Sequence, residues 1–481
     1  MKIAVEGCAH GELERIYCTI QEIEQNEDIK IDLLICCGDF QSTRNEDDLC
    51  CMAVPPKYRR ICSFYKYYNG EKIAPVLTIF IGGNHEASNY LQELPYGGWV
   101  APNIFYLGYA GVINIAGIRI GGLSGIYKAN DYLKGRFEKT PYTDSTIRSV
   151  YHIRNLDVFR LKQMSQPIDI FLSHDWPAGV YNYGNMEQLL KRKPFFKDDI
   201  ESDKLGSKPC QDLLHYLKPQ FWFSAHLHCK FAALVPHDDN TITKFLSLDK
   251  CLPRRHFLQI VNIDHNENEK IQINYDLEWL TILSLTNHLI NIKNAITYMP
   301  GPGNLERYDF TPTEDEKTLI FQKLGESLKV PNNFKPTALG YNNTSKTNSK
   351  QPPAKLNPQT VELCNLIGLD DPLRLVSENS SDSASESKVE SDISLQEKIK
   401  ELKLPEPKHE INNVNMINTA ESDGLKIETS IPIKLSPKRS LDGEVRENEE
   451  VTKPEVNNGN PSPKKFKRRN AQIYSTESHD S

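Results

Sequence analysis

The chain has 481 residues and a formal net charge of −7. This charge excludes binding of nucleic acid through overall basicity, and no apolar run is long enough to span a bilayer. All four tryptophans precede residue 280, whereas the only aromatic residues after Tyr341 are Phe466 and Tyr474. The first part of the chain can therefore bury a sizeable core, and the last part cannot.

Short apolar segments alternate with helical patterns over the first half of the chain. A strand is expected at 3–5, and apolar residues then recur at helical spacing between Leu13 and Ile23. This β-α-β-α-β order predicts an α/β fold in which helices cover a layered sheet. The later expected elements are a strand at 31–36, a helix at 57–68, a strand at 75–81, a hairpin over 112–120, and strands at 168–172 and 221–223.

Residues 127–158 interrupt this order with a polar, aromatic and basic stretch of weak periodicity. A segment of this length between two core strands is usually either functional or disordered. Its aromatic residues argue against plain disorder, so we expect a functional loop.

The remainder of the chain changes character twice. Residues 261–340 contain apolar segments and are expected to form a smaller C-terminal appendage. Residues 341–481 are rich in Asn, Ser, Lys, Glu and Pro, and this composition predicts a disordered tail. One apolar island at 361–369 could form a short helix that docks on a partner or back on the core.

Two further features bear on the compartment. The basic cluster at 461–469 is interpreted as a nuclear import signal, although a solvated charge run is the plainer alternative. The chain has 11 cysteines in no regular framework, and its first apolar run is too short for a signal peptide. We therefore expect reduced thiols in a cytosolic or nuclear protein, with the nucleus favoured and no membrane association.

Residues typical of metal sites follow five of the expected strands, where α/β sheets gather ligands. Each residue alone has an ordinary structural explanation, but the joint arrangement predicts a site for two divalent metals. Such a pair neutralises phosphoryl oxygens and generates a hydroxide nucleophile. Asp39, after a buried strand and Gly38, suits the bridging position. The other candidates are Cys8 and His10, Asn84, His174, and His226 and His228, of which the last two could serve either metal.

The motifs resemble those of the calcineurin-like metallophosphoesterases, whose pattern is Asp-x-His, Gly-Asp, Gly-Asn-His-Asp/Glu, His and Gly-His-x-His. Two residues depart from that pattern: Cys8 replaces the first aspartate and Ala225 replaces the last glycine. The cysteine is similar to the Gly-Cys-x-His-Gly motif of RNA lariat debranching enzymes. The resemblance covers about residues 1–340. It implies a layered α/β/β/α sandwich with a catalytic domain at 1–260, followed by the appendage and the tail.

The resemblance also implies a role for each matched residue. Cys8, His10 and His228 would hold one metal, Asn84, His174 and His226 the other, and Asp39 would bridge. His85 would contact the scissile phosphate without ligating a metal. Residues 124–158 would recognise branched RNA, with phosphate contacts from Lys128, Arg148 and Arg154 and base stacking by Tyr127, Tyr132, Tyr151 and His152.

The expected activity is hydrolysis of the 2′,5′-phosphodiester at the branch point of excised intron lariats. The alternatives are action on another nucleic-acid diester and an inactive scaffold of the same fold. Among metals, the thiolate favours Fe(II) or Zn(II), and the oxygen and imidazole ligands also suit Mn(II). The tail is a candidate site for a splicing or intron-turnover partner, and a truncation near residue 345 is expected to retain activity.

Overall fold

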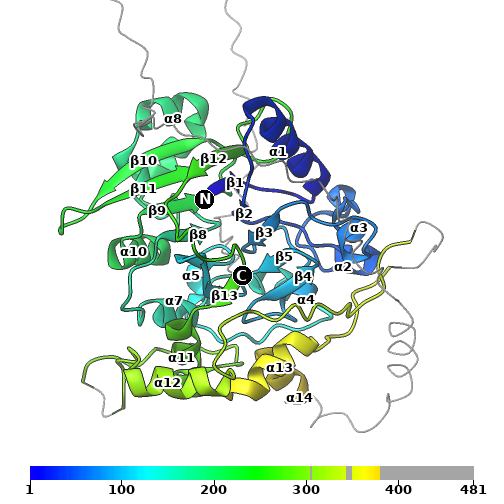
Figure 1. The fold of residues 1–481 in the computed structure, drawn as a ribbon, viewed down its shortest axis with the longest axis vertical. Helices are drawn as coiled ribbons and strands as arrows, with labels where there is room; N and C mark the ends of the chain where they lie inside the picture. The colour runs from blue at the N-terminus through cyan, green and yellow to red at the C-terminus, as the bar shows by residue number, and fades with distance from the viewer. Residues whose placement is uncertain (304–305, 343–348, 380–481) are drawn as a thin grey trace, which may run out of the picture. The chain divides into compact units, whose positions relative to one another are not determined.

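The computed structural model describes residues 1–303, 306–342 and 349–379, and these contain two β-sheets (Figure 1). The first sheet has the strand order β12-β1-β2-β3-β5-β4. Its strands are β1 (Lys2–Glu6), β2 (Leu33–Cys36), β3 (Leu77–Phe80), β4 (Gly98–Ala101), β5 (Ile104–Tyr106) and β12 (Leu258–Asn262). The second sheet has the order β10-β11-β9-β8-β7-β6-β13. Its strands are β6 (Ala110–Ile115), β7 (Ile118–Leu123), β8 (Ile170–Ser173), β9 (Phe221–Ser224), β10 (Phe231–Pro236), β11 (Ile242–Ser247) and β13 (Ile273–Tyr275).

An apolar core lies between the two sheets. Alternate strand residues supply it, because successive side chains of a strand point to opposite faces. Ile3 and Val5 of β1 contribute from one sheet, and Ile170 and Leu172 of β8 contribute from the other. All four side chains are fully buried.

Helices cover the outer face of each sheet. Leu13, Ile16 and Ile20 pack on Ala4 and Leu34 of the first sheet, because the helical spacing puts these apolar residues on one face of α1. The helices on this side are α1 (Leu13–Glu27), α2 (Glu46–Cys50), α3 (Phe64–Tyr68) and α4 (Ser88–Leu91). The second sheet is covered mainly by α7 (Asn155–Leu161), α10 (Lys208–Leu217), α11 (Leu277–Leu285), α12 (Glu314–Lys323) and α13 (Pro358–Ile367). The layered α/β/β/α expectation is confirmed.

Shorter helices lie in the connections. Those within or after the long loop are α5 (Ala129–Tyr132), α6 (Thr146–Ser149), α8 (Met186–Arg192) and α9 (Lys197–Glu201), and α14 (Pro372–Glu378) ends the described part of the chain. No helix among the described residues combines the length and the apolar character needed to cross a membrane.

The parallel strands of each sheet end at the same edge, and this alignment brings the loops with the candidate metal ligands together. In the first sheet Glu6 pairs with Cys36 and Cys36 pairs with Phe80, so β1, β2 and β3 finish at one edge. In the second sheet Leu172 pairs with Phe223, which aligns the ends of β8 and β9. The loops carrying the candidate ligands therefore leave both sheets from corresponding edges.

The helix expected at 57–68 is wrong as a single element. The chain makes one 3₁₀ turn at Pro56–Tyr58 and enters α3 only at Phe64. Arg59 has an extended backbone conformation, which ends the turn. The apolar pattern was correct for the second half of this segment alone.

The boundaries expected at 260 and 341 do not divide the structure. β12 crosses residue 260 and pairs with β1, and β13 of the expected appendage extends the second sheet by pairing with β6. α13 lies beside α12 (Figure 1), and its Leu363 and Ile367 are buried in the outer core of the second sheet. The apolar island therefore docks back on the core, and the prediction of disorder is wrong for 349–379. The basic cluster at 461–469 lies outside the described residues.

Candidate metal centre

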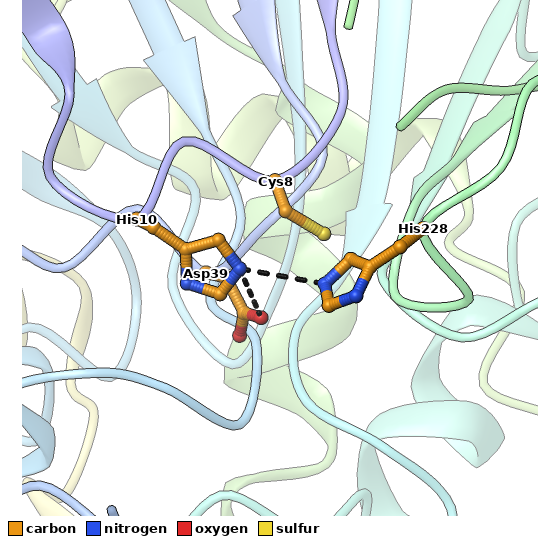
Figure 2. Close-up of side chains that lie close together, drawn as sticks. All are labelled: Cys8, His10, Asp39 and His228. Atoms are coloured by element: carbon orange, nitrogen blue, oxygen red, sulfur yellow. Dashed lines mark hydrogen bonds and ion pairs between the residues drawn. The ribbon is translucent and has the colours of Figure 1, made fainter. Parts of the chain in front are cut away.

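Four predicted ligands from two sheets converge at the strand ends. Cys8 and His10 follow β1, Asp39 follows β2, and His228 follows β9. One potential ligand atom from each of these residues lies within 4.8 Å of the others. Figure 2 shows the four side chains pointing toward one another, with His10 Nε2 3.7 Å from Asp39 Oδ2 and 3.4 Å from His228 Nε2. This donor set, a thiol, two imidazoles and a carboxylate, fits a divalent cation.

The backbone at these ligands is unusual. His10, Asp39, His226 and His228 have positive φ angles of 46°, 48°, 59° and 50°. Left-handed conformations of non-glycine residues cost of the order of 1 kcal/mol or more and cluster at functional sites. The loops are tied together where this occurs, since the His10 N–H donates to the Asp39 carbonyl at 2.6 Å.

Two glycines permit the close approach of the loops. A Cβ at Gly83 would lie 2.3 Å from Asp39 Oδ1, and a Cβ at Gly38 would lie 2.3 Å from His174 Nδ1. Gly38 also has a φ of +105°, which favours glycine. Gly38 therefore lets the chain turn tightly just before Asp39.

A second group of donors surrounds the other side of Asp39. His174 Nδ1 lies 2.7 Å from the Cys37 carbonyl, which can only accept, so this nitrogen carries a proton. His174 Nε2 lies 3.2 Å from Asp39 Oδ1. Asn84 Oδ1 and His174 Nε2 are buried without a hydrogen-bond partner. The His226 ring lies 5.0 Å from the His174 ring. Because buried polar atoms are normally satisfied, the two atoms without a hydrogen-bond partner fit a second cation that would share Asp39 with the first.

The electrostatics suit ligands. Burial lowers the pKa of His10 to about 4, of His226 to about 3 and of His228 to about 2, so these imidazoles are neutral at pH 7. Burial would raise the pKa of Asp39, but His174 and His85 hold it well below its usual range. Burial and the charge of Asp39 raise the pKa of the Cys8 thiol. A bound cation reverses that effect, because a coordinating thiol is deprotonated.

His85 lies at the rim of this cluster. Its side chain is 34% exposed, whereas the His174 side chain is fully buried. The backbone N–H of His85 donates to Asp39 Oδ1 at 2.8 Å, and the ring Nδ1 is 3.7 Å from Asp39 Oδ2. The ring is therefore beside the ligands and accessible to a substrate.

Glu86 has a role that the sequence did not indicate. Its buried carboxylate accepts hydrogen bonds from the N–H groups of Phe40 and Gln41 at 2.8 Å and of Gly83 at 2.9 Å. These bonds join the Asp39 loop to the Asn84 loop. The fourth position of the Gly-Asn-His-Glu motif was the only signal that could have identified it.

Asp175 is a second residue whose role was missed. Its Oδ2 accepts the Tyr127 N–H at 2.9 Å, and its Oδ1 lies 3.9 Å from His226 Nε2. Burial raises the pKa of Asp175 to about 6. The residue thus links the metal-site histidines to the start of the 124–158 loop.

The structure supports an accessible position for some of the predicted loop residues. Arg148 is exposed, and Lys128 and Tyr151 are partly exposed. Tyr151 lines a cavity of about 30 Å³ together with Gly83 and Glu86, next to the metal-site loops. Tyr127 and Tyr132 are partly buried and pack edge to face, with ring centroids 5.6 Å apart.

The predictions for Arg154 and His152 are wrong in this structure. Arg154 is 1% exposed, and its guanidinium donates to Glu138 Oε1 at 2.6 Å and to the Gly135 carbonyl. His152 is 8% exposed and lies 2.7 Å from Asp131 Oδ2 through Nδ1. Both side chains build the interior of the loop and do not face a ligand.

Two family models and several curated proteins are similar to the chain. The family model described as calcineurin-like phosphoesterase matches residues 1–230, and the model described as lariat debranching enzyme, C-terminal domain, matches residues 240–372. Three curated proteins named lariat debranching enzyme are similar to the chain. The protein from Drosophila pseudoobscura pseudoobscura is 50% identical, with 100% of both chains covered. The protein from Homo sapiens is 55% identical over 77% of this chain and 70% of its own, and that from Arabidopsis thaliana is 50% identical over 77% and 86%.

Proposed function

The chain belongs to the lariat debranching enzyme family, and we propose that it hydrolyses the 2′,5′-phosphodiester at the branch point of excised intron lariats. The observation that carries the proposal is Cys8, which shares a cluster with His10, Asp39 and His228 within 4.8 Å. The usual calcineurin-like motif has an aspartate at this position, whereas Cys8 agrees with the Gly-Cys-x-His-Gly motif of the debranching enzymes. The substrate is branched RNA.

Two divalent cations, when bound, would neutralise the phosphoryl oxygens and activate water for attack. Cys8, His10 and His228 would hold one cation, and Asn84, His174 and His226 would hold the other. Asp39, which lies near both groups of ligands, would serve both cations. His85, at the rim of the cluster, donates a proton to the departing 2′-oxygen. The bond from phosphorus to the 2′-oxygen breaks, which leaves a free 2′-hydroxyl and a 5′-phosphate.

The first prediction concerns substrate. The purified protein should cleave a synthetic 2′,5′-branched RNA and leave a linear 3′,5′ RNA of the same sequence largely intact, as measured by gel electrophoresis of the products. Equal cleavage of both would favour a general nucleic-acid diesterase. No cleavage together with no bound metal would favour the inactive scaffold.

The second prediction concerns the metal. Because a thiolate favours Fe(II) or Zn(II) whereas a carboxylate also suits Mn(II), Cys8→Asp should still bind cations but with preference shifted toward Mn(II). Elemental analysis of protein loaded from an equal mixture of the three metals measures this. Cys210→Ala is the matched control, because Cys210 is also a buried free cysteine. It lies in α10, the helix that covers the outer face of the second sheet. An unchanged metal ratio in Cys8→Asp would contradict the assignment of Cys8 as a ligand.

We also propose a nuclear location, supported by the basic cluster at 461–469. A tail of more than one hundred residues beyond the last described helix, α14, offers room for a splicing or intron-turnover partner.

A further inference from the structure

A buried network of hydrogen bonds holds the interior of the 124–158 loop. Glu138 is 2% exposed and accepts from Arg154 at 2.6 Å and from Ser149 at 2.5 Å. The Glu138 carbonyl accepts from Gln92 Nε2 at 2.8 Å, and Gln92 Oε1 accepts from the Tyr142 hydroxyl. These bonds connect the base of the loop to Tyr142 near its middle.

Apolar contacts around Tyr142 are few. Tyr142 and Val150 form a small cluster with Cys51, and Ile147 and Tyr151 pack against it. This cluster is separate from the three larger cores. A small cluster contributes little stability by itself, so the outer part of the loop depends on additional contacts.

Those contacts come from a segment more than 200 residues after Tyr142 in the chain. We call residues 349–357 the C-terminal strap; it runs from α2 to α13 (Figure 1). Ser349 Oγ donates to Glu46 Oε2 at 2.8 Å, and the Lys350 N–H donates to Asp47 Oδ1 at 3.0 Å. The strap is thereby attached to the first turn of α2 just before it reaches the loop.

Gln351 then binds the loop backbone on both sides of one residue. Its Oε1 accepts the Tyr142 N–H at 2.5 Å, and its Nε2 donates to the Tyr142 carbonyl at 3.0 Å. The side-chain amide bonds to Tyr142 as a neighbouring strand would, and it satisfies both the N–H and the carbonyl of that residue. Tyr142 packs in the same cluster as Tyr151, which lines the cavity beside Gly83 and Glu86.

We propose that Gln351 is a positioning residue for substrate recognition. By holding the backbone of Tyr142, it keeps Tyr151 and the exposed Arg148 in the arrangement that receives branched RNA. This assignment rests on the proposed function for the identity of the substrate, but the clamp itself is independent of it.

The strap region contains a matched control. Gln359, in the first turn of α13, makes the same pair of bonds to a different residue: its Oε1 accepts the Trp99 N–H at 2.8 Å, and its Nε2 donates to the Trp99 carbonyl at 2.9 Å. Trp99 belongs to β4 of the first sheet. Gln359→Ala therefore removes an equivalent backbone clamp that does not contact the 124–158 loop.

The test compares Gln351→Ala, Gln351→Glu and Gln359→Ala in the full-length protein. In Gln351→Ala we expect KM for 2′,5′-branched RNA to rise about threefold to tenfold, the size expected from losing hydrogen bonds that hold a loop. The kcat for bis(4-nitrophenyl) phosphate, a diester too small to need the loop, should stay unchanged. Gln351→Glu keeps the acceptor and loses the donor, so its KM should fall between wild type and Gln351→Ala. Gln359→Ala should lower Tm and leave both kinetic constants as in wild type.

Hydrogen exchange separates this proposal from the proposed function. Peptides covering 142–151 should exchange faster in Gln351→Ala than in wild type or Gln359→Ala, with no substrate present. Faster exchange in a protein that does not cleave branched RNA would overturn the proposed function and keep the clamp. Unchanged exchange and unchanged KM in Gln351→Ala would overturn the clamp, as would equal loss of activity on both substrates.

Discussion

Asp39→Ala should abolish phosphodiester hydrolysis and stoichiometric metal binding together. Asp39 is the only carboxylate in the four-residue cluster, and it also lies 3.2 Å from His174 on the other side. Its removal takes away the one carboxylate that lies near both groups of candidate ligands, so both cations should be lost together. Elemental analysis of the purified variant and an assay on branched RNA measure the two losses.

His85→Ala is the comparison that gives this result its meaning. His85 borders the same cluster but has its side chain at the rim, so this variant should keep both cations and lose about 10²- to 10⁴-fold in rate. It should still bind branched RNA. A metal-free His85→Ala protein would make His85 a ligand and refute its assignment as the proton donor. Metal retained in Asp39→Ala would equally refute the bridging role of Asp39.

Truncation after α14 should leave the protein stable and active, whereas truncation before α13 should unfold it. A protein ending at Asn379 should fold and debranch RNA as the full chain does, whereas a protein ending at Asn342 should not fold stably. The second truncation removes six buried apolar side chains. Five of them are Leu, Ile or Val, each contributing about 1.5–3 kcal/mol, so the loss is about 8–15 kcal/mol. That is comparable to the whole stability of a typical domain. The six are Leu363, Cys364, Ile367, Leu369, Leu373 and Val376.

Circular dichroism melting and the branched-RNA assay distinguish the two truncated proteins. This expectation replaces the one drawn from composition, which placed a tolerated truncation near residue 345. Full activity in the protein ending at Asn342 would show that the helices beyond it are dispensable. The protein ending at Asn379 also lacks the basic cluster at 461–469, so it should shift from the nucleus toward the cytoplasm. Unchanged nuclear accumulation would refute the import signal.

The sequence by itself determined the layered fold and the candidate metal ligands. Strands such as β1 and β8 are short runs of mostly apolar residues that can be recognised locally, and a candidate ligand is recognised by its own chemistry and by the strand end that it follows. Cys8, Asp39 and His174 could therefore be identified from their positions along the chain. The register of the parallel strands then brought them together.

Only the tertiary structure decided which other residues face the interior. Arg154 has the charge expected of a phosphate contact, but its guanidinium is buried against Glu138, 16 residues earlier in the chain. Gln351 and Tyr142 are 209 residues apart, and no local periodicity records their pairing. The docking of α13 likewise depends on an apolar surface formed by distant strands and helices. Local periodicity and residue chemistry are properties of short segments, whereas these contacts arise between segments that meet only when the chain is folded.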